Sequence, residues 1–195
     1  MNPSLVGSEM CIRDRSMGMD VFLLGPIPTP GVAMITKSMR ADLGIMITAS
    51  HNQFHDNGVK IFDRSGNKLS DKIENEIESL MSLDIENYLV EAESIGRAQR
   101  LEDANARYIE FVKNTFDKTQ TLEGIKVVVD CANGASYISA PTILWELGAD
   151  VIQIGNKPNG YNINKGFGST DTSMLVHTVL KLSLIHISEP TRLGF

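Results

Sequence analysis

A short polar loop carries the residues of this sequence that are best suited to chemistry. Ser50 and His51 come directly after an apolar run, and Lys60 follows a little further along the chain. A serine hydroxyl can carry a phosphoryl group when it is exposed and when cations offset the charge of the phosphate, about −1.5 to −2 at neutral pH. Lys60 is the nearest candidate cation, and His51 could orient the loop or move a proton. The pattern therefore suggests a phosphate-carrying serine.

The same loop has a simpler interpretation. Ser and Asn side chains in loops often do no more than hydrogen-bond the nearby backbone, and an isolated lysine is most often solvated. A hydrolase nucleophile elbow is excluded, because that motif needs glycine two positions before and two positions after the serine, where Thr48 and Asn52 stand. The residues alone leave a plain turn and a phosphate carrier as open alternatives.

Composition narrows the class of protein. The 195 residues, 42% of them hydrophobic and 22% charged, are typical of a soluble globular protein with one or two small domains. A net charge of −6, with no run of Lys or Arg longer than a pair, gives no reason to expect binding to nucleic acid or to an acidic membrane. No apolar run approaches the roughly 20 residues of a membrane span, and no signal peptide is recognisable, so we expect a cytoplasmic protein. The oligomeric state is left open.

The two cysteines do not suggest a disulfide framework or a zinc site. Cys11 and Cys131 are too few and too far apart for either. Cys131 lies in an apolar run, where we expect a reduced and packed thiol.

The two ends of the chain have an unusual relationship. With ordinary codons for Glu9–Arg15, the complementary DNA strand translates as Leu182–Ser188. An inverted repeat of this kind is typical of the adapters of transposon-based libraries. We therefore expect residues 1–15 and 182–195 to be non-native tails, and we base the fold on residues 16–181.

Hydrophobic patterning predicts an α/β protein. Apolar runs predict strands, and polar segments with helical periodicity predict helices. A buried strand should deliver the loop with Ser50, and the strand–helix–strand order after residue 125 is a βαβ unit, which favours a parallel sheet. The expected strands are residues 21–24, 43–48, 59–62, 125–130 and 151–154, and the expected helices are 29–40, 71–81, 103–116 and 139–147, with a further helix after Asp171. The expected N-cap residues are Thr29, Asp103 and, for the last helix, Asp171. In the helix over 103–116, an apolar stripe is formed by Tyr108, Phe111, Val112 and Phe116.

The loop with Ser50 also resembles a known family. Thr48–Asn52 followed by Asp56–Lys60 is similar to the active-serine signature of the α-D-phosphohexomutase superfamily. Phosphomannomutases and phosphoglucomutases share that loop but fit the rest of the sequence less well. Gln53 stands where the family usually has proline. The stretches that resemble the phosphoglucosamine mutases, in the same order, are Pro28–Pro30, Gly66–Leu69, Tyr108–Glu110, Val128–Ala135, Pro158–Asn164 and Gly168–Thr170.

The resemblance implies a specific reaction. Ser50 would be a phosphoserine that converts glucosamine 6-phosphate to glucosamine 1-phosphate through a bound 1,6-bisphosphate, on the route to UDP-N-acetylglucosamine and the cell wall. His51 and Lys60 would have supporting roles, and an oxygen of the phosphate on Ser50 would be one ligand of a catalytic Mg²⁺. The alternatives are a phosphomannomutase or phosphoglucomutase, and a non-catalytic relative that binds phosphosugars.

The resemblance also implies truncated phosphohexomutase domains with mixed and parallel sheets flanked by helices. Residues 16–100 would be part of domain 1 with the active-serine loop, 101–122 a bridging helix and linker, and 123–181 part of domain 2. The Asp-Gly-Asp-Gly-Asp-Arg loop that completes the family's magnesium site has no counterpart here, because the sequence has no Asp-x-Asp-x-Asp spacing. We therefore expect the chain by itself to be inactive. Asp130–Ala135 is expected to be an architectural turn, and Asn156–Gly168 a connector between domains.

Overall fold

The structure is a computed structural model that describes residues 11–81 and 88–182. Most of the two predicted non-native tails, residues 1–10 and 183–195, lies outside the described residues, so their assignment stays a prediction. Residues 11–16 are helical, and Arg15 Nε donates a hydrogen bond to the carbonyl of Gly96 at 2.9 Å.

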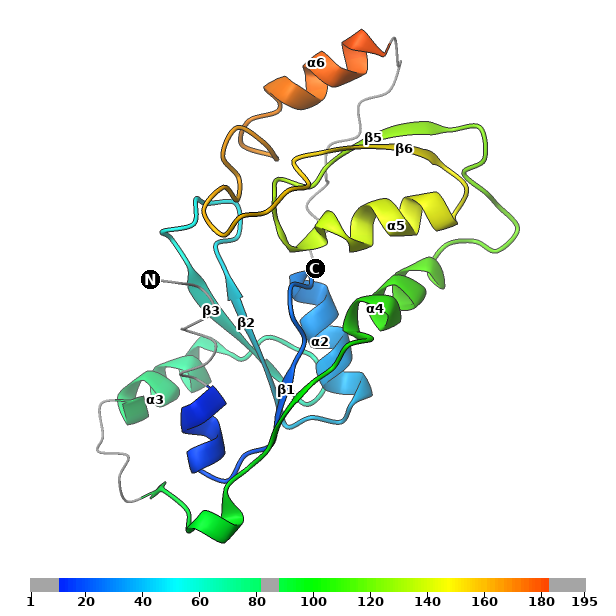
Figure 1. Cartoon of the computed structure of the whole chain (residues 1–195). Helices are drawn as coiled ribbons and strands as arrows, with labels where there is room; N and C mark the ends of the chain where they lie inside the picture. Colours follow the sequence, from blue (N-terminus) through cyan, green and yellow to red (C-terminus); the bar gives the residue numbers. More distant parts are fainter. Residues whose placement is uncertain (1–10, 82–87, 183–195) are drawn as a thin grey trace.

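Two short sheets and a helix form the first part of the protein (Figure 1). Strand β1 (Val21–Leu23) pairs in parallel with β4 (Ala98–Arg100), and β2 (Leu43–Thr48) pairs antiparallel with β3 (Gly58–Asp63). Helix α2 (Thr29–Ser38) packs against β2. Their shared core is formed by Ile27, Val32, Ile35, Phe62 and Ala104. The predicted class, mixed α/β with small sheets flanked by helices, is confirmed.

The limits of α2 differ slightly from the prediction. Pro28 rather than Thr29 is the N-cap residue, since Thr29 already has helical geometry. The helix ends at Ser38 rather than at Arg40, because Arg40 has a φ of +57° and lies in the left-handed region. The next helix, α3 (Asp71–Met81), has the predicted limits. After it, a single turn of 3₁₀ helix, η2 (Ala92–Ser94), leads into β4.

The second part of the protein is the predicted βαβ unit. Strand β5 (Lys126–Asp130) pairs in parallel with β6 (Asp150–Ile154), and the connection consists of η3 (Ala135–Tyr137) and α5 (Ser139–Glu146). Helix α6 (Ser173–Lys181) packs against β5. The small core of this part is formed by Val128, Leu175 and Val179, with Ile152 and Ile154 packed against them. Thr172 is the N-cap residue of α6, so the predicted cap at Asp171 is off by one residue.

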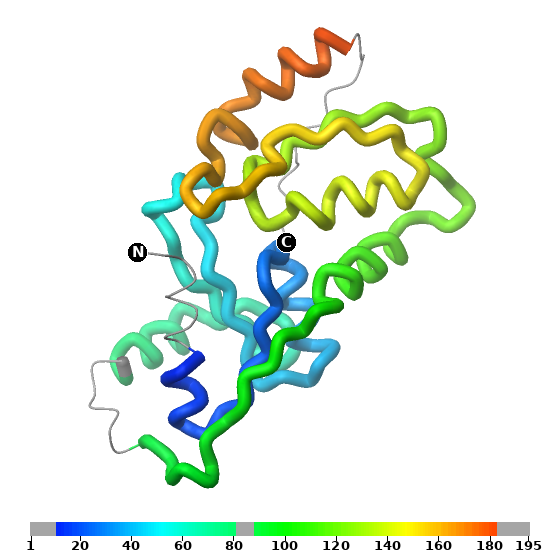
Figure 2. Tube along the Cα trace, viewed as in Figure 1, coloured from blue at the N-terminus to red at the C-terminus, as the bar shows by residue number. Residues whose placement is uncertain are grey.

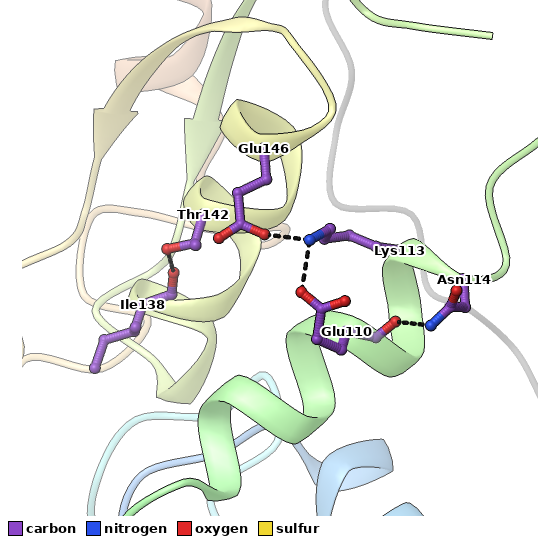
Figure 3. Close-up of polar contacts among 6 residues, drawn as sticks. All are labelled: Glu110, Lys113, Asn114, Ile138, Thr142 and Glu146. Atoms are coloured by element: carbon purple, nitrogen blue, oxygen red, sulfur yellow. Dashed lines mark hydrogen bonds and ion pairs between the residues drawn. The ribbon is translucent and has the colours of Figure 1, made fainter. Parts of the chain in front are cut away.

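Helix α4 (Ala104–Lys113) lies between the two parts and contacts both α2 and α5 (Figures 1 and 2). At its end, Lys113 Nζ lies 2.7 Å from a carboxylate oxygen of Glu110 and 2.5 Å from one of Glu146 on α5 (Figure 3). Hydrogen bonds from the ammonium to Glu110 and then to Glu146 raise the pKa of Lys113 above its ordinary value. One lysine therefore connects the middle helix to the second part of the protein.

The apolar stripe predicted for this helix is only partly right. Phe111 is 52% exposed, whereas Ile109 and Ala104 are buried. Because α4 packs between two neighbours, the positions that it buries are set by where α2 and α5 lie, and the strongest apolar residues do not all fall there. Asp103 is the N-cap residue, as predicted, but its carboxylate accepts a hydrogen bond from Arg107 Nε at 2.8 Å instead of capping the helix. Among the described residues, no helix is both long enough and apolar enough to cross a membrane.

Candidate functional site

Ser50 stands at the point where β2 ends. The preceding residue, Ala49, is buried and 3% exposed, while Ser50 itself is exposed and has a φ of +54°. A left-handed backbone is uncommon for a residue other than glycine and is often found at functional sites. It turns the chain away from the strand, and the Ser50 N–H donates a hydrogen bond to Thr48 Oγ1 at 3.0 Å. The structure therefore presents this serine at the surface, directly after a packed residue.

The segment from Ala49 to Asn57, here named the serine loop, is partly held by ordinary turn contacts. The Asn52 N–H donates to the carbonyl of Ala49 at 2.9 Å, and Asn57 Nδ2 donates to the carbonyl of Phe54 at 2.8 Å. The Ser50 hydroxyl makes no such backbone contact among the described residues. Its Oγ lies 3.4 Å from His51 Nδ1, with both groups exposed. Turn contacts thus account for the side chain of Asn57 and the backbone of Asn52, but they leave the hydroxyl of Ser50 available.

Close packing between α2 and β2 fixes the strand that carries the serine loop. A Cβ atom on Gly44 would lie 2.0 Å from Thr36 Oγ1, so glycine allows the strand to approach the helix. Thr36 is 4% exposed, and its hydroxyl donates to the carbonyl of Val32 at 2.8 Å. The prediction of a buried strand is therefore right for one face only, because alternate residues face solvent on the opposite side. These are Leu43, Ile45 and Ile47, which are 52%, 41% and 38% exposed.

Lys60 lies on β3 in the same hairpin. It pairs with Met46, and the last pair of the hairpin is Thr48 with Gly58. Met46 packs against the first core, on the side of α2. Because residues paired across strands share a face, Lys60 lies on that side too. Two residue steps, about 7 Å, separate this pair from the end of the hairpin. Lys60 is half-buried, and its ammonium makes no ion pair or hydrogen bond within the described residues. Its supporting role stays a prediction, as does that of His51.

A second segment, residues 156–168, reaches the serine loop from the other part of the protein; we name it the asparagine loop (Figures 1 and 2). The Nδ2 of Asn164 donates to the carbonyl of Ser50 at 3.0 Å and to the carbonyl of Asn52 at 2.6 Å. Tyr161 and Phe54 make an edge-to-face contact, with ring centroids 5.4 Å apart. The sequence indicated only a connector here and carried no signal of these contacts, because the two loops are separated by more than 100 residues of sequence.

The turn after β5 anchors the asparagine loop. Asp130, 6% exposed, accepts hydrogen bonds from the N–H groups of Ala132 at 2.8 Å and Gly168 at 2.7 Å. The carbonyl of Ala132 accepts from the Asn164 N–H at 2.8 Å. Asn133 and Gly134 donate their N–H groups to other backbone carbonyls, so the turn has no row of free donors for a phosphate. The geometry agrees with an architectural role.

Cys131 lies within this anchor and is 3% exposed. Burial raises the pKa of its thiol to about 11, and the nearby negative charge of Asp130 adds to the effect. Cys131 is free of any disulfide, so the structure supports the predicted reduced and packed thiol, and its raised pKa favours the protonated form.

The described residues do not form a metal centre. Within residues 11–81 and 88–182, no three His, Cys, Asp or Glu side chains gather closely enough to hold an ion. Mg²⁺ needs several oxygen ligands, and one serine phosphate would supply only part of them. The residues present do not by themselves fit the metal that the resemblance implies.

Comparison with known proteins gives consistent matches. Residues 15–87 match the sequence model of the family described as phosphoglucomutase/phosphomannomutase, alpha/beta/alpha domain I. A phosphoglucosamine mutase from Parvibaculum lavamentivorans is 58% identical over 166 residues, which cover 85% of this chain and 37% of that protein. One from Afipia carboxidovorans is 59% identical over 178 residues, with coverage of 91% and 40%.

Solved structures agree on the fold. A phosphoglucomutase/phosphomannomutase family protein from Burkholderia thailandensis superimposes with a TM-score of 0.68 at 24% identity, over 92% of this chain and 39% of that one. A putative phosphomannomutase from Thermus thermophilus gives a TM-score of 0.67 at 26% identity, over 86% and 38%. The chain thus spans between a third and two fifths of the length of the relatives that it matches.

Proposed function

We propose, since this chain belongs to the phosphohexomutase family, that the protein of which it forms part is a phosphoglucosamine mutase. Its substrates would be glucosamine 6-phosphate and glucosamine 1-phosphate, and Ser50 would be the residue that carries phosphate between them. The identity of 58–59% to two proteins of that name supports the amino sugar over glucose or mannose. The observation that carries the proposal is the exposed Ser50, in a left-handed conformation at the end of β2.

The chemistry would run in two symmetrical halves. A hydroxyl oxygen of the sugar phosphate attacks the phosphorus on Ser50, and the bond between Oγ and phosphorus breaks. The proton that leaves the sugar hydroxyl is balanced by the one that Ser50 gains, so the products are a bisphosphate and a free serine. After the bisphosphate has reoriented in the site, Ser50 recovers the other phosphate by the reverse step. Nothing is consumed in the cycle.

His51 and Lys60 would assist this transfer. His51 Nδ1 lies 3.4 Å from Oγ, and in this proposal it would accept or return the proton of the serine. Lys60, unpaired among the described residues, would offset part of the phosphate's charge. Mg²⁺ is part of the proposal for the whole protein, in which a phosphoserine oxygen would be one of its ligands. A cytoplasmic location and a role in making UDP-N-acetylglucosamine belong to the same proposal.

The test uses the full-length protein that contains this segment. After incubation with glucosamine 1,6-bisphosphate, peptide mass spectrometry should find one added phosphate, on Ser50, with glucosamine monophosphate released. Ser50→Ala should take up no phosphate and should lose the mutase activity. The matched control is Ser65→Ala, which removes another exposed hydroxyl, in the turn after β3, and should behave like the unmodified protein.

Two results would refute parts of the proposal. If the protein binds the bisphosphate tightly but Ser50 never becomes phosphorylated, it is a binding protein rather than a mutase. If phosphate transfers faster from glucose or mannose 1,6-bisphosphate than from the glucosamine compound, the sugar assignment is wrong.

A further inference from the structure

The serine loop and the asparagine loop are joined by one side-chain amide. The single amide of Asn164 donates to two carbonyls, those of Ser50 and Asn52, which lie on either side of His51. Fixing both carbonyls restricts the rotation of the peptide groups between them. Those peptide groups set the direction in which the side chains of Ser50 and His51 leave the backbone.

Asn164 is itself held firmly. It has a φ of +56°, a conformation that asparagine tolerates better than most residues. Its N–H donates to the carbonyl of Ala132, and the N–H of Ala132 donates to the buried carboxylate of Asp130. A short chain of hydrogen bonds therefore connects the end of β5 to the backbone of the serine loop.

We propose that Asn164 is a positioning residue for Ser50, and that phosphate transfer at this serine depends on the asparagine loop being seated against the serine loop. The second part of the protein therefore completes the geometry of the nucleophile, which lies in the first part. Left-handed Ser50 carries backbone strain, and the two carbonyl contacts from Asn164 stabilise that conformation. Without them, Ser50 samples conformations in which Oγ no longer lines up with a bound phosphate.

The first test needs no activity and uses the whole 195-residue chain. Asn164→Gly removes the amide but keeps a residue that adopts a positive φ. Hydrogen–deuterium exchange of peptides that span residues 48–57 should become about five to ten times faster, because hydrogen bonds that hold the loop are lost. Exchange in β5 and β6 should not change. Asn164→Asp, which keeps the size and loses the N–H donors, should give the same result if the glycine variant folds poorly.

The control removes a different amide of the same loop. Asn156 Nδ2 donates to Gln153 Oε1 and makes no contact with the serine loop, so Asn156→Ala should leave exchange at residues 48–57 unchanged. Unchanged exchange in both Asn164 variants would overturn the proposal, as would an equal increase in the Asn156 variant.

The second test rests on the proposed function. In the full-length protein, Asn164→Gly should lower the rate of phosphate transfer to Ser50 from glucosamine 1,6-bisphosphate about tenfold or more, while KM changes less than about twofold. An unchanged rate would overturn the positioning role. If the unmodified protein transfers no phosphate, the proposed function fails instead, and the exchange experiment still decides whether Asn164 holds the loop.

Discussion

Replacing Gly44 by alanine tests how the serine loop is supported. Gly44 lies on β2 at the contact with α2, where an added Cβ would stand 2.0 Å from Thr36 Oγ1 and 3.1 Å from Thr36 Cβ. Thr36 cannot turn away easily, because it is buried and its hydroxyl bonds to the carbonyl of Val32. The helix and the strand must therefore separate by about 1 Å, in an interior that tolerates little strain.

The expected magnitude follows from two opposing effects. Overpacking of this kind costs about 1–3 kcal/mol, and replacing glycine by alanine in the unfolded chain returns about 0.4–1 kcal/mol. We expect Gly44→Ala to lower the free energy of unfolding by about 1–2 kcal/mol. For a chain of this size, that corresponds to a fall in Tm of about 2–8 °C.

The assay is urea unfolding of the 195-residue chain, followed by circular dichroism. The matched control is Gly58→Ala on the paired strand, where the nearest atom to an added Cβ is the carbonyl oxygen of Thr48 at 3.9 Å. That control should change the stability by less than about 0.5 kcal/mol. Adding Thr36→Ala to Gly44→Ala should recover part of the loss, because it removes the atom that clashes.

Equal stabilities of the Gly44 and Gly58 variants would refute this reasoning. Such a result would mean that α2 does not hold β2 at the distance seen here, and that another contact supports the serine loop.

Three further predictions concern the core, a thiol and a turn. Ile27→Ala should destabilise the chain by about 2–5 kcal/mol because Ile27 is 1% exposed, whereas Ile45→Ala should cost less than about 1 kcal/mol because Ile45 is 41% exposed. Equal losses of stability in urea unfolding would contradict the assigned core. In a Cys11→Ser background, iodoacetamide at pH 8 should alkylate Cys131 at least about 100 times more slowly in the native chain than in urea, because a pKa of about 11 leaves little thiolate. Similar rates in the two conditions would refute the burial of Cys131. Hydrogen bonds from the Asn67 N–H and the Ser65 N–H lower the pKa of Asp63, so the stability that this carboxylate contributes is present above the ordinary pKa of 3.8 and is lost as the pH falls through the lower folded pKa. Asp63→Asn should therefore flatten the loss of stability between about pH 5 and pH 2, and an unchanged slope would show that the turn is not the cause.

The sequence predicted most of the elements because their signals are local. Alternating apolar residues, Gly-rich turns and caps lie within a few positions of one another, and they placed β2, α3 and the parallel β5–β6 unit with small errors at the ends. The serine of the candidate site was also predictable, since an exposed hydroxyl after an apolar strand is a feature of one short segment.

The errors arose where a neighbour distant in sequence decides the outcome. The prediction of a buried β2 failed because α2 packs against one face while alternate residues of the other face are exposed, and Phe111 is exposed because α4 packs between two other helices. Periodicity shows that a segment has an apolar face, but it does not show how much of that face another element covers.

What the sequence by itself determined is the kind of residue available: a serine directly after an apolar strand, with His51 and Lys60 near it along the chain. Only the tertiary structure decided how that serine is held. Asn164 meets the carbonyls of Ser50 and Asn52 because the turn after β5 brings a segment from the second part of the protein against the first. Hydrogen bonds depend on distances in space, and more than 100 residues of intervening chain leave no local pattern that would reveal such a contact.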